Sequence, residues 1–408
     1  MERARVIVVG GGFWGCSTLW HLAARGLTDC LLVEQGELAG ETTGQAAGMI
    51  GQLRTSAVAS RAATYGVELL RRFDREVGSP SPFREVGSVK VALTAGRVEE
   101  LRRQVADARR LGLAAVLVAP AEAARLAPGL DKRRIRAAAH VASDGYLDPA
   151  ATARALAAAA ERAGARVWTG TRVTGISVGR DRVRGVSTER GPVRADTVVV
   201  AAGPWAGRLA ATAGIELPLY PVRHQLAVTS PLDGLPDWFP LVRVPDAGAY
   251  LRPDGRDLWF GRFERRPASY DPRRLGPGFR TKDVPPGQGA LRTARARLRE
   301  IFPLLGDAAV VHARAGLPGF TPDGEHLVGA LPRPRGLVIV AGCSATGIMD
   351  GLAMGRVAAE LVAGERPFLD IEGMDPARFG RRYARRAALR AACEGVYRNY
   401  YSLRAGRV

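Results

Sequence analysis

Three glycines near the N-terminus have the spacing of a nucleotide-binding turn. They belong to the segment Gly10-Gly11-Gly12-Phe13-Trp14-Gly15, which reads G-x-G-x-x-G. Gly10 permits a tight turn, Gly12 lets the backbone approach a pyrophosphate, and Gly15 lets a helix pack close to a strand. Glu34, about 20 residues downstream, can accept hydrogen bonds from ribose hydroxyls and would repel a 2′-phosphate. These residues predict a dinucleotide site, with FAD and NAD both open.

The neighbouring elements occur in the order that such a site requires. Arg5 to Val9 is a β-branched run without alternation, which is typical of a strand buried on both faces of a parallel sheet. A helix is predicted over Cys16 to Arg25, ending at Gly26, and a second apolar strand over Cys30 to Val33. The helix N-terminus would offer unpaired N–H groups and the positive end of its dipole to phosphates.

Two later strands return to the same sheet. Residues 197–203 form a buried strand that ends in glycine, and residues 337–342 form another that leads into a helix over 348–363. Residues 219–263 alternate and contain turn signals, which predicts an antiparallel sheet. Because a strand returns so late, the predicted fold class is α/β: a Rossmann-like dinucleotide domain interrupted by an α+β substrate domain with an antiparallel sheet.

The boundaries of these domains follow from the order of the elements. Asp148 and Pro149 mark the start of a well-capped helix, which Gly164 ends. The predicted dinucleotide domain comprises 1–80, 145–215 and 325–370, the substrate domain 81–144 and 216–324, and a basic C-terminal helical tail 371–408. The tail is predicted to be a solvated helix clamped on the body of the protein.

Composition limits the class of protein. The chain has 408 residues, 47% of them hydrophobic, which suffices for two packed domains. No apolar run approaches the length of a membrane span and the first strand begins at once, so a cytoplasmic protein without a membrane partner is expected. The four cysteines lack C-x-x-C spacing and the five histidines lack an H-x-x-x-H pair, so neither structural disulfides nor a metal site is predicted.

The net charge of +19 raises the question of a nucleic-acid ligand. All but three of the 59 basic residues are arginines, and they are spread along the whole chain. No basic run is interleaved with stacking aromatics, so nucleic acid is not the predicted partner, although the overall field can attract anionic substrates.

Several motifs in the right order carry a family resemblance. The chain resembles the D-amino-acid-oxidase-like superfamily of FAD-dependent amine oxidoreductases, and within it the flavin domain of dimethylglycine and sarcosine dehydrogenases and oxidases. The motifs are Val8 to Gly15 with Glu34, Thr42 to Arg54, Asp144 to Pro149, Val199 to Trp205, Pro221 to Gln225, Phe320 to Gly324, Ala341 to Met349, and Arg378 to Gly380.

The resemblance implies FAD as the cofactor and a set of residues that contact it. These are Gly10, Gly12, Phe13, Trp14, Gly15, Glu34, Gln35, Thr42, Thr43, Gln45, Ala47, Gly48, Met49, Val173, Ala202, Gly203, Trp205, Gly342, Thr346, Gly347, Ile348 and Met349.

Three positions depart from the pattern of the relatives. Gln45 stands where the dehydrogenases carry a histidine bonded to flavin, and Gly316 where monomeric sarcosine oxidases carry a flavin-linking cysteine. FAD is therefore expected to bind non-covalently. Pro318 stands where glycine-oxidase-like relatives have an arginine for the substrate carboxylate, which argues against that mode of binding an amino acid. The folate-binding domain that follows in the dehydrogenases lies outside the sequence.

The resemblance also places catalytic residues. His224 and Tyr250 match a histidine and a tyrosine near the flavin in dimethylglycine-oxidising relatives. They could orient an amine and adjust its protonation, or they could only order a sheet and pack. Arg54 could pair with a substrate carboxylate, or it could be one of many surface arginines. Cys343 is expected to be a small packing residue.

The predicted function is FAD-dependent oxidation of a small amine, a secondary or tertiary N-methyl amine or an N-substituted amino acid. A hydride passes to flavin N5 and the imine then hydrolyses. Alternatives are an oxidase of a primary D- or α-amino acid, a flavin-binding subunit of a larger complex, or an RNA-modifying flavoenzyme. Oxygen or an electron-transfer protein would accept the electrons, and the amine, the acceptor and the oligomeric state stay open.

Overall fold

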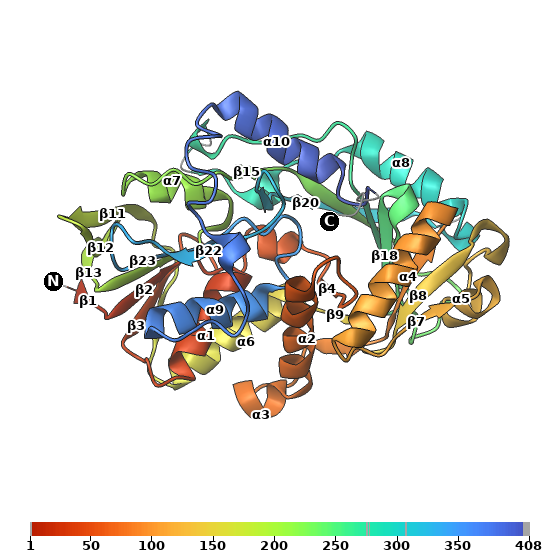
Figure 1. The fold of residues 1–408 in the computed structure, drawn as a ribbon, viewed down its shortest axis with the longest axis horizontal. Coiled ribbons are helices and arrows are strands. Elements are labelled where there is room, and N and C mark those ends of the chain that lie inside the picture. The colour runs from red at the N-terminus through yellow and green to blue at the C-terminus, as the bar shows by residue number, and fades with distance from the viewer. Residues whose placement is uncertain (1, 275, 277, 307, 403–408) are drawn as a thin grey trace.

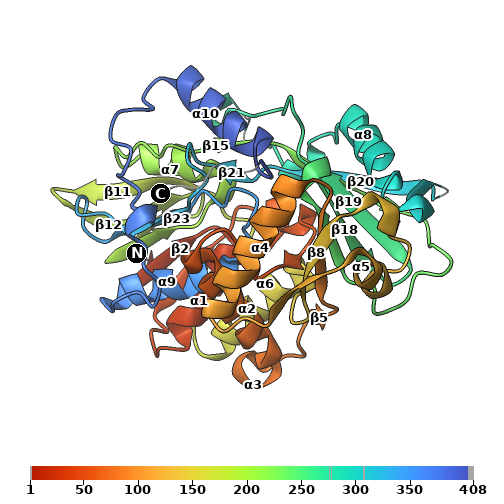
Figure 2. The same ribbon diagram turned by 45° about the vertical axis from the view of Figure 1, so that its right-hand side comes forward.

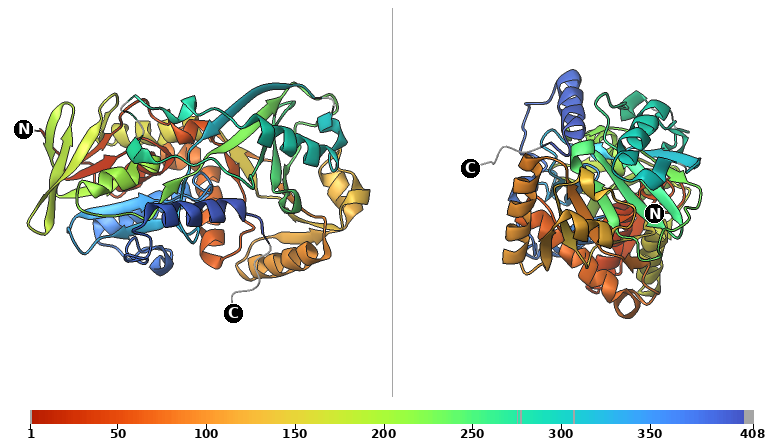
Figure 3. Two further views of the ribbon diagram at one scale, coloured as in Figure 1. Left: turned by 90° about the horizontal axis from the view of Figure 1, so that it is seen from above. Right: turned by 90° about the vertical axis from the view of Figure 1, so that its right-hand side faces the viewer.

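The computed structural model describes residues 2–274, 276, 278–306 and 308–402. Two large sheets lie toward opposite ends of the long axis, and the N-terminal end of the chain lies on the side of the six-stranded sheet (Figures 1 and 3). Among the helices of these described residues, none has the length and apolar character needed to cross a membrane.

The first sheet has six strands and contains both the first and the last strand predicted for the dinucleotide domain. Its strands are all parallel except the last, which is antiparallel to its neighbour. Their order is β10 (Arg166–Trp168), β3 (Cys30–Val33), β2 (Val6–Val9), β14 (Thr197–Val200), β23 (Leu337–Ala341) and β22 (Leu327–Ala330). Val6 and Val8 pack on one face and Ile7 and Val9 on the other, which explains why the strand shows no polar alternation.

Helices cover one face of this sheet, and a small sheet with one helix covers the other (Figure 1). The first layer is α1 (Phe13–Ala23), α6 (Pro149–Arg162) and α9 (Gly351–Ala363). The second is α7 (Ala206–Ala211) with β1 (Glu2–Arg3), β13 (Gly191–Arg194), β12 (Arg182–Thr188) and β11 (Val173–Gly179). The sequence predicts the start of α6 correctly, since the Asp148 carboxylate accepts hydrogen bonds from the N–H groups of Ala150 and Ala151.

Helix α1 begins earlier than predicted, because the second half of the glycine turn is already helical. It starts at Phe13 rather than Cys16. A Cβ atom on Gly15 would overlap the carbonyl oxygen of Gly10, so only glycine allows the helix to lie directly on the strand end.

The second sheet has eight strands and is antiparallel apart from one parallel pair, β17 with β6. The order is β20 (Val310–Gly316), β16 (His224–Thr229), β19 (Asp257–Arg262), β18 (Ala249–Asp254), β17 (Leu241–Val244), β6 (Ser88–Ala92), β8 (Ala137–Val141) and β7 (Ala115–Val118). Helices α5 (Pro120–Leu126) and α8 (Gln288–Arg299) pack on one face, and α4 (Ala95–Arg110) lies against part of the other (Figure 2). The interrupted α/β fold with an antiparallel sheet confirms the predicted fold class.

Short elements join the two sheets. They are β4 (Met49–Ile50), β9 (Gly145–Leu147) and β5 (Phe83–Glu85) in one small sheet, β15 (Tyr220–Pro221) and β21 (Gly319–Phe320) in another, and the helices α2 (Ala57–Arg71) and α3 (Phe73–Val77). The chain thus passes repeatedly between the two large sheets, which places residues of several segments at their junction.

The C-terminal helix α10 (Arg386–Arg398) packs more deeply than a solvated tail would. Leu389, Cys393 and Tyr397 are buried against β15 and β21, while the opposite face of the helix is exposed. The chain then continues to Tyr400 and Tyr401, whose rings pack on Phe263. The tail is therefore part of the core near the junction of the sheets.

Replacement of Leu389 by alanine tests this packing. Because the side chain is only 3% exposed, Leu389→Ala should lower the free energy of unfolding by about 2–4 kcal/mol. Ala388→Ser on the exposed face is the matched control and should change it by less than about 0.5 kcal/mol. Urea unfolding measures both, and equally small effects would contradict the docked helix.

Candidate active site

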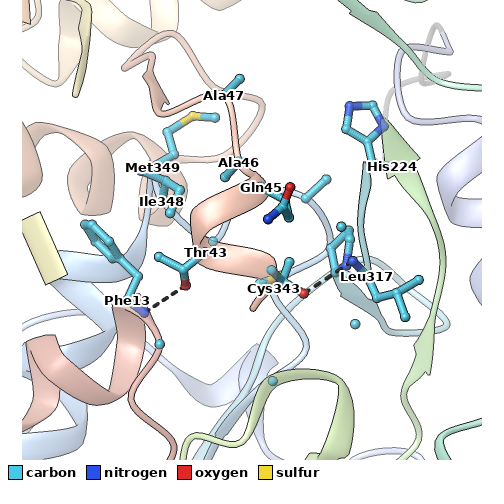
Figure 4. Close-up of a pocket in the computed structure, with 18 of the residues that line it drawn as sticks. Phe13, Thr43, Gln45, Ala46, Ala47, His224, Leu317, Cys343, Ile348 and Met349 are labelled. Carbon is cyan, nitrogen blue, oxygen red and sulfur yellow. Dashed lines mark hydrogen bonds between the residues drawn. The ribbon is translucent and has the colours of Figure 1, made fainter. Parts of the chain in front are cut away.

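A cavity of about 200 Å³ lies where the parallel strands end and the eight-stranded sheet faces them. We call it the central cavity. Phe13, Thr43 and Met349 line one side, and His224 projects from β16 on the other (Figure 4). A second cavity of about 120 Å³, the strand-end cavity, continues from it past residues that line both, among them Gly12 and Gly203.

Nearly all of the residues predicted to bind the cofactor surround these two cavities. The central cavity is lined by Gly12, Phe13, Trp14, Thr42, Thr43, Gln45, Ala47, Gly48, Met49, Gly203, Gly342, Gly347, Ile348 and Met349. The strand-end cavity adds Gly10, Glu34, Gln35, Val173, Ala202 and Trp205. Two predicted residues lie elsewhere, since Gly15 sits beneath the turn and Thr346 lines a third cavity.

Glu34 is held in place by the backbone of the turn. Its carboxylate accepts hydrogen bonds from the N–H of Gly11 at 2.6 Å and of Gly36 at 2.8 Å. Burial raises the pKa of Glu34, and these two bonds oppose the rise by stabilising the carboxylate. Each oxygen keeps a further acceptor site for a ribose hydroxyl in the strand-end cavity.

The backbone around the two cavities is bare enough for a dinucleotide to approach. Gly203 has a φ of +51°, and a Cβ atom built there would meet nothing within 4 Å. At the start of α1, the N–H of Phe13 donates to the hydroxyl of Thr43 at 3.0 Å (Figure 4). Bare backbone, a helix N-terminus and a ribose-facing carboxylate together fit the two phosphates and one ribose of FAD.

His224 lies at the centre of a chain of three hydrogen-bonding side chains. Its Nε2 is 3.0 Å from the Tyr250 hydroxyl, and its Nδ1 is 3.1 Å from the Tyr397 hydroxyl. The imidazole also stacks on Phe263, with ring centroids 4.5 Å apart. Gly261 makes room for this arrangement, because a Cβ atom there would overlap the Tyr250 ring. The sequence-predicted pair His224 and Tyr250 therefore meets, and both residues line the central cavity.

The environment keeps all three of these side chains uncharged at neutral pH. Burial lowers the pKa of His224 to about 4 and raises the pKa values of Tyr250 and Tyr397. A neutral imidazole donates one hydrogen bond and accepts another, so His224 donates to one phenol and accepts from the other. These three side chains thus offer neutral polar atoms that can orient an amine.

Arg54, the other predicted catalytic residue, is placed differently. It lines a third cavity of about 560 Å³, which we call the polar cavity, and not the central one. Its guanidinium pairs with Asp350 at 3.4 Å and contacts the sulfur of Met349 at 2.5 Å. Arg243 on β17 instead lines both the central and the polar cavities.

Several residues of the central cavity were not predicted from the sequence. Besides Arg243, they include Phe263 and, from the C-terminal tail, Tyr400 and Tyr401, while Tyr397 supports His224 from behind. The only local signal for the tail residues is their spacing, since positions 397, 400 and 401 fall on one face of a helical segment.

Comparison with known families shows to which family the chain belongs. Residues 5–361 match the family described as DAO, FAD dependent oxidoreductase. The chain belongs to this family. The predicted resemblance and the predicted FAD are therefore confirmed, and the flavin is held without a covalent bond. The matched region stops before α10, so the tail residues at the central cavity lie outside it.

Two of the curated relatives are named for the oxidation of N-methylated compounds. The chain is 32% identical over 384 residues to sarcosine dehydrogenase of Homo sapiens, covering 93% of this chain and 42% of that protein. It is 31% identical over 405 residues to the formaldehyde-forming 4-methylaminobutanoate oxidase of Paenarthrobacter nicotinovorans, covering 98% and 48%. The chain thus spans less than half the length of these two relatives. The solved L-proline dehydrogenase from P. horikoshii has a TM-score of 0.84 at 28% identity, covering 93% of this chain and 98% of that one.

Replacement of Glu34 by glutamine tests the strand-end cavity. A glutamine oxygen can serve one backbone N–H but not both, and the charge is lost, so the dissociation constant for FAD should rise about tenfold or more. Titration of the apoprotein with FAD, followed by flavin fluorescence, gives the value. Glu37→Gln is the exposed control and should leave it unchanged. Unchanged binding in Glu34→Gln would contradict the assignment.

Acidification tests the state of His224. Because its pKa falls from the ordinary 6.5 to about 4, the unfolded chain takes up the proton first. Stability is therefore lost as the pH falls between these two values, and from pH 7 to pH 5 the native protein should lose about 2 kcal/mol more than His224→Asn. Urea unfolding at both pH values measures the difference. The exposed His312→Asn is the control, and an equal loss in native protein and His224→Asn would show that the ring is not held neutral.

Proposed function

We propose that the protein oxidises a small amine that carries a methyl group on nitrogen, with FAD as the oxidant. The observation that carries this proposal is the uncharged Tyr250–His224–Tyr397 chain on the wall opposite the glycine turn. An amine can lose a hydride from its neighbouring carbon only as the neutral base, and an uncharged wall does not stabilise the ammonium form.

Each group of residues has a distinct part in this proposal. Glu34 and the turn at Gly10 to Gly15 would hold the adenosine and pyrophosphate part of FAD, and the small residues from Gln45 to Met49 would lie beside its ring. FAD, when bound, supplies the acceptor for a hydride. The Tyr250 hydroxyl, held in place by His224, would hydrogen-bond the amine nitrogen and orient its methyl group, and the amine would release its proton to solvent as it enters the site.

Aromatic side chains would protect the reaction from water. Tyr400 stacks on Phe263 with centroids 4.0 Å apart, and Phe263 stacks on His224, so an aromatic layer backs the polar chain. The imine that results from oxidation then takes up water and separates into an aldehyde and the shortened amine. Restricting water near His224 before oxidation keeps the site desolvated and strengthens its hydrogen bonds.

The names of the relatives support an N-methyl substrate over a primary amino acid. Sarcosine and 4-methylaminobutanoate both carry a methyl group on nitrogen. In the stretch where an arginine would bind the carboxylate of a primary amino acid in the glycine-oxidase manner, this chain has Pro318, which also lines the central cavity. A primary amino-acid oxidase is therefore the less favoured function.

The visible spectrum of the purified protein tests the proposal. The yellow colour should pass into the supernatant on acid precipitation, and anaerobic addition of sarcosine, dimethylglycine or 4-methylaminobutanoate should bleach it. Tyr250→Phe and His224→Gln should slow the bleaching by about 100-fold or more, because the first removes the hydroxyl that orients the amine and the second removes the imidazole that holds this hydroxyl. Admitting air then shows whether oxygen reoxidises the flavin.

Three results would count against the proposal. A flavin that no amine bleaches would reject it, and bleaching by primary amino acids alone would favour the alternative. Exposed Arg382→Gln is the control variant and should bleach like the native protein. Equal bleaching by the native protein, Tyr250→Phe and His224→Gln would remove the role given to the polar chain.

A further inference from the structure

The polar cavity has four basic side chains and four carboxylates on its walls. The basic residues are Arg54, Lys90, Arg97 and Arg243, and the carboxylates are Glu100, Asp323, Glu325 and Asp350. Arg243 also lines the central cavity. Tyr400 and Tyr401 line both cavities as well, so the two spaces meet at these three residues. A ligand in the central cavity can therefore reach the guanidinium of Arg243.

Two of the four cations are neutralised by nearby carboxylates. Arg54 pairs with Asp350 at 3.4 Å. Arg97 pairs with Glu100 and, at 3.3 Å, with Asp246. Asp323, another carboxylate of this cavity, pairs with Arg378 at 2.9 Å.

The other two cations lack such a partner within the described part of the chain. Neither Lys90 nor Arg243 has a carboxylate within 4.0 Å there, although Asp144 and Glu100 lie farther off. Lys90 donates to the amide oxygen of Gln104 at 2.7 Å, and Arg243 lies 4.0 Å from the Met349 sulfur and hydrogen-bonds the Tyr401 side chain. Burial, with the charge of Arg243 nearby, lowers the pKa of Lys90 to about 7, so an anion bound beside the two residues would favour the charged form of the lysine.

Strand register aligns these two cations with the proposed catalytic chain. Lys90 on β6 pairs with Arg243 on β17, and Arg243 pairs with Tyr250 on β18. Directly paired residues project from the same face of a sheet, and neighbouring strands lie about 4.8 Å apart. The row therefore runs from the phenol that contacts His224 to one cation on the next strand and a second cation one strand farther.

We propose that Arg243, with Lys90 beside it, binds the carboxylate of the substrate while the Tyr250 hydroxyl, held by His224, contacts its amine. This inference rests on the proposed function and narrows its substrate class to amines with a carboxylate at the far end of a short carbon chain. Because Arg243 lies on the strand next to Tyr250 and Lys90 one strand farther, a substrate that reaches from Tyr250 to both basic residues is longer than an α-amino acid. Arg243 is suited to the role since its planar guanidinium can donate two parallel hydrogen bonds to a carboxylate.

Binding of a compound that cannot be oxidised tests the carboxylate site independently of catalysis. Calorimetric titration of the FAD-loaded protein should show butanoate binding at least about 10-fold more tightly than butanamide. Arg243→Gln should remove most of this preference, Arg243→Lys should retain part of it, and Lys90→Gln should reduce it less than Arg243→Gln does. Arg262→Gln on β19, whose side chain lines neither cavity, is the control and should keep the preference.

Kinetics of flavin reduction supply the second half of the test. In the native protein, the second-order rate constant for flavin reduction should be about 30-fold or more higher with 4-methylaminobutanoate than with N-methylbutylamine. It should also be higher than the rate constant with sarcosine, by a smaller factor. Arg243→Gln should lose the rate with the acid while N-methylbutylamine reacts as before. Equal loss with acid and neutral amine would show a structural role for Arg243 and overturn the proposal.

The two measurements separate failure of this inference from failure of the proposed function. If butanoate binds to the native protein and binds more weakly to Arg243→Gln, but no amine bleaches the flavin, the carboxylate site is supported and the proposed reaction is rejected. If amines bleach the flavin but butanoate binds no better than butanamide, the reaction stands and the carboxylate site is overturned.

Discussion

The contact between the start of α1 and the end of β2 is the constraint on which the rest of the site depends. Helix α1 packs so closely on the Gly10 carbonyl that a Cβ atom on Gly15 would overlap it. This close contact fixes the position of the helix relative to the end of the strand. Helix α9 then packs on α1 just as closely, because Gly355 has no Cβ to meet Ser17. The indole N–H of Trp14 donates to the Gly347 carbonyl at 2.6 Å, so a loop more than three hundred residues away closes over the same turn. One glycine contact thereby positions both walls of the nucleotide site.

The eight-stranded sheet supplies what the parallel sheet lacks, a wall of polar side chains. Along one face, Lys90, Arg243 and Tyr250 succeed one another on neighbouring strands, and His224 lies beyond the space left by Gly261. Neutral groups therefore stand at one end of this row, and at the other stand two basic groups that no carboxylate of the described residues contacts. Such a gradient suits a ligand with an amine at one end and an acid at the other, and the tail helix α10 fixes the neutral end through Tyr397.

The parallel sheet and the nucleotide turn could be predicted from the sequence because the residues that specify them lie close together in the chain. β-Branched strands, the glycine spacing and the Asp148-Pro149 helix start depend on residues close in the chain. The partners of His224 could not be found in the same way, since Tyr397 lies 173 residues away and meets it only through tertiary packing. Likewise, in a chain with so many arginines, only the folded structure distinguishes Arg54, which Asp350 neutralises, from Arg243, which no carboxylate contacts among the described residues. Strand β20 also escaped prediction, because exposed Val310 and Val311 break the alternation expected of it.

The rate of anaerobic flavin reduction with a deuterated substrate tests the central claim most directly. If the carbon–hydrogen bond next to nitrogen breaks at this site, 4-methylaminobutanoate with a deuterated N-methyl group should reduce the flavin several-fold more slowly than the unlabelled compound. Reduction at the same rate by both compounds, or by neither, would contradict the account of an amine held at His224 and Tyr250 for oxidation at its methyl carbon.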